Sequence, residues 1–167
     1  MPTIKLTLEY EGTHYAGWQR QLNQPTIQEA LETAITKVTR QTISVIAAGR
    51  TDAGVHALGQ VVSFRIDRDM TAYEWTMALN AHLPPDISVR AVDFPPPEFH
   101  ARYKATGKLY QYRILNRSPR LALNRQLFWH VYKPLDDAAM NLAALHLIGS
   151  DRKSTRLNSS HRCISYA

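Results

Sequence analysis

The first 94 residues predict an α+β fold, an antiparallel sheet of four strands with two helices on one face. Three observations support this expectation. Apolar and polar residues alternate at the start of the chain, as in a strand with one buried face. Two later segments repeat apolar residues at helical spacing behind a capping pattern. Short apolar runs follow each of these segments and have the length of further strands.

The first three elements are read in chain order. Residues 3–10 alternate and predict a half-buried strand. Residues 27–38 repeat apolar residues at helical spacing, and Thr26 with Glu29 forms a capping-box pattern at the start of this helix. Residues 43–48 are a short apolar run that predicts the second strand.

The remaining elements complete the pattern. Residues 60–66 predict the third strand, and residues 73–83 a second helix that begins at a capping box of Thr71 and Glu74 and ends before two prolines. Residues 87–92 predict the fourth strand. The order β-α-β-β-α-β is that of the ferredoxin-like fold, with one sheet face left open.

A domain boundary is expected after residue 94, where three consecutive prolines form a stiff linker. We assign residues 1–94 to an N-terminal ferredoxin-like domain, 95–107 to the linker, and 108–150 to the incomplete start of a second, similar α+β domain. The expected elements of this second part are strands over 108–115 and 126–132 and a helix over 136–148, with Gly149 as its C-cap. The helix presents one apolar face, formed by Met140, Ala143, Ala144 and Leu147.

Residues 151–167 read like the translation of a sequencing-library adapter, because a back-translation of residues 151–161 fits such an adapter codon for codon. The alternative is a genuine polar tail that is disordered by composition. We treat this segment as a non-native tail and exclude it from the fold. We therefore expect the natural chain to continue where the tail begins, and the sequence as given to be an inactive fragment.

Charge and cysteine content exclude little once the tail is set aside. The chain has a net charge of +6, but residues 151–167 hold four basic residues and one acidic one, so that residues 1–150 carry only +3. This mild excess is weak evidence for nucleic-acid binding. The single cysteine, Cys163, also lies in the tail, which suits a reducing cytoplasm. The sequence has no apolar run long enough to span a membrane and no signal peptide, so we expect a cytoplasmic protein.

The segment that carries chemistry is the connection between the second and third strands, residues 48–56. A hairpin needs only a short turn, whereas this loop places Arg50, Thr51 and Asp52 between Gly49 and Gly54. A carboxylate two residues from a guanidinium can be kept ionised and aimed, as a nucleophile or general base requires. The alternative is an ordinary turn with a weak surface ion pair.

Residues 49–56 (GRTDAGVH) resemble the signature of the tRNA pseudouridine synthase A family. Four further segments recur in the order found in that family, namely residues 15–21 (YAGWQRQ), 26–31 (TIQEAL), 99–102 (FHAR) and 110–112 (YQY). An eight-residue motif with four supporting segments is a specific signal. The resemblance covers residues 3–149.

The resemblance implies a tRNA pseudouridine synthase, an isomerase that converts uridine to pseudouridine at positions 38–40 of the anticodon stem-loop. It implies a homodimer and no organic cofactor or obligatory metal. Asp52 matches the catalytic carboxylate of the family, and the sequence leaves open whether this group attacks C1′ or acts as a base. Tyr110 matches the tyrosine that stacks on the target base, although its alternation with Tyr112 is also typical of a core strand. Arg50 could hold a phosphate or keep the base flipped.

Other candidate residues for RNA binding lie in two flexible segments. Tyr15, Trp18 and Arg20 combine aromatic rings with a cation, which suits an RNA loop, but Trp18 could instead fold onto the core. After the prolines, Arg102 is a candidate phosphate ligand, and His100 either joins it or is structural. We expect no metal site, because the histidines and Asp52 have no spacing typical of metal ligands.

Two other functions use the same fold. A non-catalytic RNA-binding module of the RRM type would need aromatic residues on its central strands, and residues 60–66 contain only Phe64. An acylphosphatase-like enzyme would need a phosphate-binding loop after the first strand, and residues 11–15 are a poor match to one.

Overall fold

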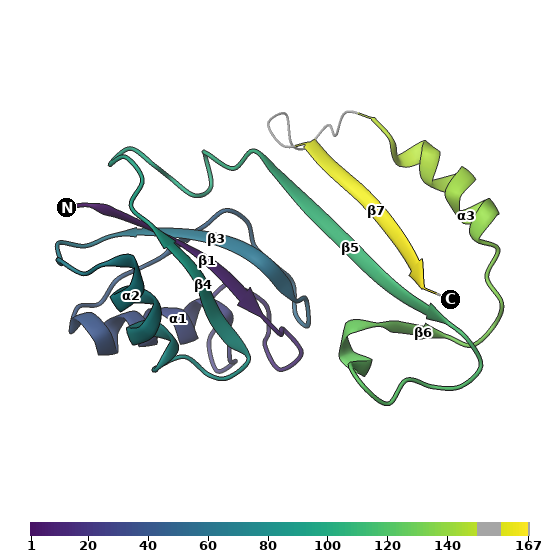
Figure 1. The fold of residues 1–167 in the computed structure, drawn as a ribbon, viewed down its shortest axis with the longest axis horizontal. Coiled ribbons are helices and arrows are strands. Elements are labelled where there is room, and N and C mark those ends of the chain that lie inside the picture. Colours follow the sequence, from purple (N-terminus) through teal and green to yellow (C-terminus); the bar gives the residue numbers. More distant parts are fainter. Residues whose placement is uncertain (150–157, 167) are drawn as a thin grey trace. The chain divides into compact units, whose positions relative to one another are not determined.

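The computed structural model describes residues 1–149 and 158–166, and these separate into two compact units, Met1–Lys104 and Ala105–Ala167 (Figure 1). The first unit has the predicted order of elements. They are β1 (Thr3–Tyr10), α1 (Ile27–Thr39), β2 (Ile46–Ala47), β3 (Ala57–Arg65), α2 (Ala72–Asn80) and β4 (Ile87–Asp93).

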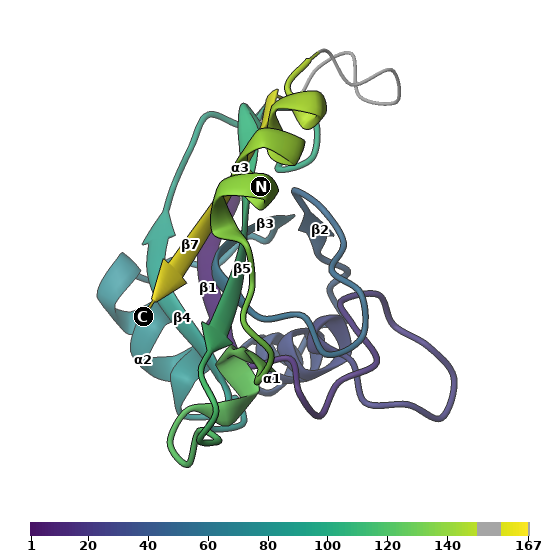
Figure 2. The ribbon, with the colours of Figure 1, turned by 90° about the vertical axis from the view of Figure 1, so that its right-hand side faces the viewer.

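The strands of the first unit form one sheet in the order β2-β3-β1-β4, with every neighbouring pair antiparallel. Figure 2 shows β2 and β4 at its two edges. This is the predicted ferredoxin-like α+β topology. The buried side chains of α1 and α2 belong to the same core as one face of β1, so that both helices cover that face, as expected. The core is built around Ile4, Leu6, Leu8, Leu31, Ile35, Trp75 and Leu79.

Local signals at the helix ends explain the boundaries. Thr26 caps α1 by accepting a hydrogen bond from the Glu29 amide. Thr71 and Glu74 form the full capping box of α2. α2 ends at Asn80 rather than at residue 83, because the Asn80 amide group bonds both the carbonyl oxygen and the N–H of Val89 in β4. These bonds fix the last turn of the helix against the sheet.

The strand boundaries differ from the prediction in two places. β2 is only two residues long, although the apolar run extends over residues 43–48, because only Ile46 and Ala47 pair with β3. β3 begins at Ala57 instead of residue 60, since Ala57 pairs with Tyr10 at the end of β1. The expected open face is partly covered near the start of β1, where Thr3 and Arg65 donate hydrogen bonds to the carbonyl oxygen of Pro97.

The second unit contains β5 (Gly107–Asn116), a 3-10 turn η1 (Arg125–Leu127), β6 (Trp129–Val131), α3 (Asp137–Ala144), a second 3-10 turn η2 (Leu145–Leu147) and β7 (Asn158–Tyr166). Its strands lie in the order β6-β5-β7, and β5 pairs in parallel with both neighbours. This arrangement differs from the antiparallel order of the first unit, so that the second unit does not repeat it within the described residues.

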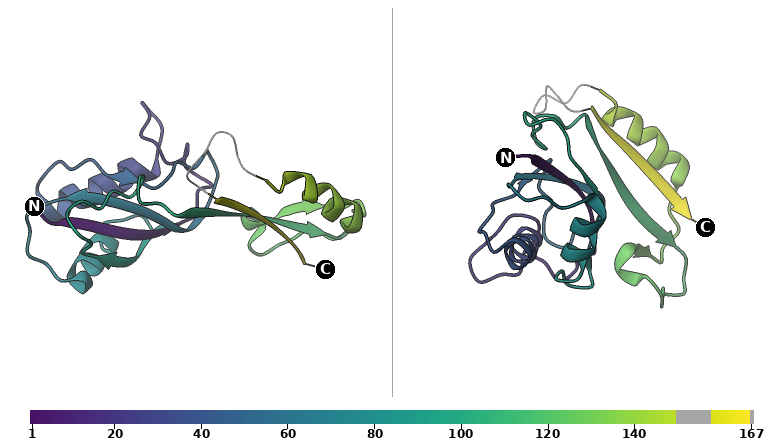
Figure 3. Two further views of the ribbon diagram at one scale, coloured as in Figure 1. Left: turned by 90° about the horizontal axis from the view of Figure 1, so that it is seen from above. Right: turned by 60° about the vertical axis from the view of Figure 1, so that its left-hand side comes forward.

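Three expectations for the second unit are corrected. The strand over residues 126–132 is shortened to β6 by the preceding 3-10 turn. The helix over 136–148 ends at Ala144 and continues as η2, which is capped by Ile148 and not by Gly149. Residues 158–166, to which we assigned no element, form β7, and the rest of the expected tail lies outside the described residues. No side chain of α3 is buried, and Figure 3 shows the helix on the side of β7 that faces away from β5.

Candidate functional site

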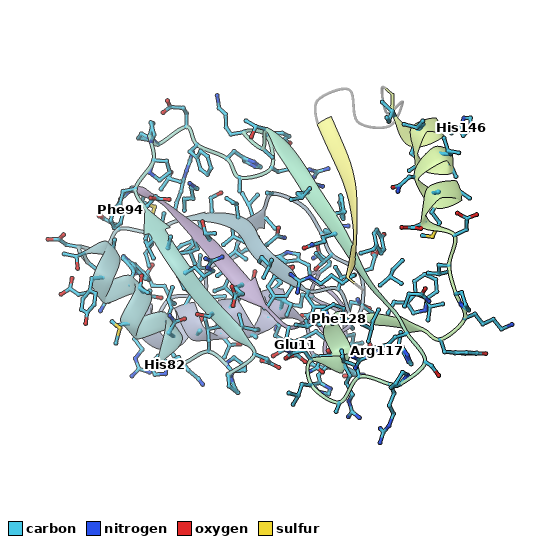
Figure 4. The ribbon with its side chains drawn as sticks, turned by 45° about the vertical axis from the view of Figure 1, so that its right-hand side comes forward. Glu11, His82, Phe94, Arg117, Phe128 and His146 are labelled. Carbon is cyan, nitrogen blue, oxygen red and sulfur yellow. The ribbon has the colours of Figure 1, made fainter. Side chains whose placement is uncertain are left out.

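Residues 48–56 connect two adjacent antiparallel strands, β2 and β3, as predicted. The Ala48 N–H donates to the Val61 carbonyl oxygen and extends the ladder by one bond. The Gln60 side chain donates to the Gly49 carbonyl oxygen. The loop therefore leaves the sheet from a fixed point. Ala57, the residue after the loop, pairs with Tyr10 at the end of β1. The loop therefore lies at the same end of the sheet as Glu11, and Phe94 lies at the opposite end (Figure 4).

The loop that follows β1 holds this connection in place, which the sequence analysis did not foresee. The Trp18 N–H donates to the Thr51 carbonyl oxygen at 2.9 Å, and the Gly54 N–H donates to the Tyr15 carbonyl oxygen at 3.2 Å. The Tyr10 hydroxyl and the Thr51 hydroxyl lie 2.8 Å apart and share a hydrogen bond. Two segments that the family resemblance singled out separately thus form one structure.

Two glycines allow the loops to approach each other. A Cβ on Gly12 would lie 2.1 Å from the carbonyl oxygen of Val55, closer than any non-bonded contact allows. Gly17 has a φ of +98°, and its Cβ would lie 2.5 Å from the carbonyl oxygen of Thr51. Only glycine fits at either place. The Gly12 N–H also donates to His56 Nδ1 at 3.2 Å.

Asp52 lies on a tight turn at the tip of this structure. The Val55 N–H donates to the Asp52 carbonyl oxygen, and Gly54 has the positive φ, +78°, that a type II turn requires at its third residue. The Asp52 side chain is exposed, and so is that of Arg50. The two side chains form no ion pair in the described structure, so the weak surface ion pair of the alternative interpretation is not present.

Trp18 belongs to the core and not to the surface. Its side chain is only 2% exposed and packs near the ring of Tyr10, with centroids 6.3 Å apart. Of the two alternatives considered for Trp18, the structure has the one in which the ring folds onto the core. Trp18 thus anchors the loop beneath Asp52, whereas its ring is not available to stack on RNA.

Tyr15 is half-buried and donates a hydrogen bond to Asp86 at 2.6 Å. Burial, together with the adjacent Asp86 carboxylate, raises the pKa of Tyr15 far above its ordinary value of 10.0. The Tyr15 hydroxyl therefore joins the loop after β1 to the turn before β4.

Stability at high pH should report this contact. The unfolded chain ionises Tyr15 near pH 10, while the folded chain keeps it protonated, so this contribution to the free energy of unfolding is full below that pH and declines above it. We expect Tyr15→Phe to flatten the fall in stability between pH 10 and 11, measured by urea unfolding. Tyr73→Phe, at an exposed position, is the control and should leave the pH dependence unchanged.

Arg20 is already occupied within the first unit. Its guanidinium lies 3.1 Å from Glu29 Oε1 and 3.6 Å from Glu32 Oε2. This candidate RNA-binding residue thus faces two carboxylates. Arg102, by contrast, is exposed and forms no ion pair in the described part of the chain.

His100 lies in the segment that packs on the sheet after the prolines. Its ring stacks on Tyr103 at 4.2 Å between centroids, and its Nδ1 accepts a hydrogen bond from the Tyr103 N–H. The adjacent Ala101 N–H donates to the Ser63 hydroxyl. The segment expected to be a linker is thereby bonded to β3, and His100 contacts Tyr103 within it.

Tyr110 lies on β5 in the second unit and is 40% exposed. Tyr112 is more exposed, at 67%, so neither ring is a core residue of this unit. Among the described residues, no cluster of three or more His, Cys, Asp or Glu could hold a metal ion. None of the helices in the described part of the chain is both long enough and apolar enough to cross a membrane.

Comparison with known protein families identifies the family to which the first unit belongs. The sequence model of the tRNA pseudouridine synthase family matches residues 7–104, which include both loops of the site. The chain belongs to this family.

Curated relatives agree with this assignment. The chain is 50% identical over 150 residues to tRNA pseudouridine synthase A of Rhodospirillum centenum, covering 89% of this chain and 61% of the relative. It is 48% identical over 149 residues to tRNA pseudouridine synthase A of Myxococcus xanthus (89% and 56%) and 49% identical over 149 residues to that of Geobacter sulfurreducens (89% and 61%). The chain thus spans about three-fifths of the length of the curated relatives it matches.

Proposed function

We propose that this chain carries the catalytic aspartate of a tRNA pseudouridine synthase, and that the enzyme isomerises uridines 38–40 in the anticodon stem-loop. The observation that carries the proposal is the exposed Asp52 carboxylate on a turn whose backbone is fixed by a second loop. A fixed backbone with a free carboxylate suits a group that must meet a substrate rather than a partner within the protein. The names of the relatives support tRNA as the substrate.

The reaction exchanges one bond of the nucleoside for another. The bond between C1′ and N1 breaks, the uracil turns, and C1′ bonds to C5, while the proton of C5 leaves and N1 gains a proton. Asp52 either attacks C1′ or removes a proton during an elimination, and both routes need its ionised form. A base in a stem must first leave the stack, at a cost of a few kcal/mol.

Three other side chains supply the remaining roles in this proposal. Arg50 and Arg102 hold phosphates, because neither has an ion pair in the described structure. Tyr110 stacks on the flipped base, an interaction worth about 1–3 kcal/mol. The chemistry needs no organic cofactor, and we place the enzyme in the cytoplasm as a homodimer.

The packing of the sheet disfavours an RNA-binding module. Phe64, the aromatic residue of the predicted third strand, is buried in the core against Trp75 and does not face solvent. The opposite face of β1 presents threonine, lysine and glutamate side chains, which offer no ring for base stacking. The acylphosphatase alternative is disfavoured as well, because the Gly12 N–H that would bind a phosphate donates to His56.

The test follows the proton of C5. Transcribed tRNA labelled with tritium at C5 of uridine is incubated with the protein. We expect the protein to release tritium to water, with pseudouridine mapped to positions 38–40. Tight tRNA binding without release would favour the binding module instead.

A further inference from the structure

Glu32 is a charged side chain in the interior of the first unit. It lies on α1 and is only 9% exposed. Its Oε1 accepts hydrogen bonds from Gln28 Nε2 at 2.9 Å, from the Val45 N–H at 3.1 Å and from the Ser44 hydroxyl at 3.4 Å. Its Oε2 lies 3.6 Å from Arg20. A buried carboxylate needs such partners, since an unpaired buried charge is costly.

One branch of these contacts leads to the catalytic loop through β2. Val45 immediately precedes β2 (Ile46–Ala47), and the loop that bears Asp52 begins directly after it. β2 is only two residues long, so its pairing with β3 fixes its position weakly. The bond from the Val45 N–H to Glu32 ties this short strand to α1.

The other branch reaches the same loop from the opposite side through Gln28, which is also buried. The Gln28 side chain donates to Glu32 and accepts from the Arg20 N–H at 3.1 Å, while its backbone N–H donates to the Trp18 carbonyl oxygen. The Trp18 N–H in turn donates to the carbonyl oxygen of Thr51, the residue before Asp52. Glu32 is thus the point at which both supports of the loop meet.

We propose that Glu32 is a positioning residue for Asp52, joining β2 to the Arg20 segment, and that Arg20 serves this junction and binds no phosphate. The proposal rests on the proposed function for its catalytic part. The second part of the proposal, that Arg20 binds no phosphate, follows from charge. Arg20 faces the carboxylates of both Glu29 and Glu32, so these three side chains carry a net charge of −1 and repel a phosphate.

The decisive variants are Glu32→Ala and Glu32→Gln. Alanine removes every side-chain contact of Glu32, whereas glutamine keeps an acceptor for the Val45 N–H and replaces the charged oxygen opposite Arg20 with an N–H donor. We expect Glu32→Ala to lower the single-turnover rate of tritium release about 10- to 100-fold with an unchanged Kd for tRNA, and Glu32→Gln to restore most of that rate. Glu29→Gln, the matched control on the exposed partner of Arg20, should change the rate less than about twofold.

Two further measurements keep the proposal testable if the synthase activity itself fails. Hydrogen exchange followed by mass spectrometry should show faster exchange in residues 46–57 for Glu32→Ala, with β1 still protected. The slope of log Kd for tRNA against log salt should be the same for Arg20→Ala as for the unmodified protein, whereas Arg102→Ala should reduce it by about 0.7–0.9. Unchanged exchange and rate in Glu32→Ala, or a reduced slope in Arg20→Ala, would overturn the proposal.

Discussion

Asp52→Asn is expected to lower kcat for tritium release by at least about 10³-fold and to change KM and the melting temperature little. Asparagine has the same shape but carries no charge, and the Asp52 side chain makes no hydrogen bond or ion pair within the described structure that its loss would break. The fold needs only the backbone of Asp52, whose carbonyl oxygen closes the turn with Val55. The comparison is made by multiple-turnover kinetics on labelled tRNA.

The control for this prediction is Asp69→Asn. Asp69 is exposed and lies in the connection between β3 and α2, away from both loops of the site. Its replacement should leave kcat within about twofold of the unmodified protein. A variant Asp52→Asn that keeps more than a tenth of kcat would assign the chemistry to another group.

Among the glycine-to-alanine substitutions discussed for the first unit, Gly12→Ala is expected to lower the stability most. The new Cβ would lie 2.1 Å from the backbone oxygen of Val55, so the two loops must separate. Overpacking of this kind typically costs about 1–3 kcal/mol of stability and occasionally more. We expect the cost to lie above this range here, because the atom in the way belongs to the backbone. We expect the melting temperature to fall by about 5 °C or more and tritium release to fall about 10²-fold, because Asp52 moves with its loop.

Gly59→Ala is the matched control, since a Cβ on Gly59 meets nothing within 4 Å. Gly17→Ala is a second test, because that residue combines a positive φ with a close approach to Thr51. We expect both glycine variants of the β1 loop to act alike in differential scanning calorimetry and in the release assay. A fully stable Gly12→Ala would mean that the two loops are not held together as described.

The elements of the first unit could be predicted because their signals are local. The alternation of β1 and the capping box at Thr71 need only neighbours in sequence. The position of the Asp52 loop between two strands followed from the same patterns. Prediction failed where a boundary depends on contacts with another element. The end of α2 is set by the hydrogen bonds of Asn80 to Val89 in β4, and the length of β2 is set by its pairing with β3.

The arrangement of the candidate site could be predicted only in part. The resemblance singled out Asp52 and Trp18, but no local pattern shows that one is exposed and the other buried. Which two loops pack together depends on tertiary structure, so nothing in the sequence indicated that Gly12 lies against Val55. Glu32 shares a helix with one other glutamate, Glu29, and only the fold distinguishes the buried carboxylate of Glu32 from the more accessible one of Glu29.

The most direct test of the account separates binding from chemistry in one sample. Labelled tRNA is incubated with a molar excess of Asp52→Asn for the time in which the unmodified protein completes one turnover, and both bound tRNA and released tritium are counted. The account predicts that the tRNA is bound and that no tritium is released. Complete release by Asp52→Asn would contradict the assignment of the carboxylate on this loop as the catalytic group.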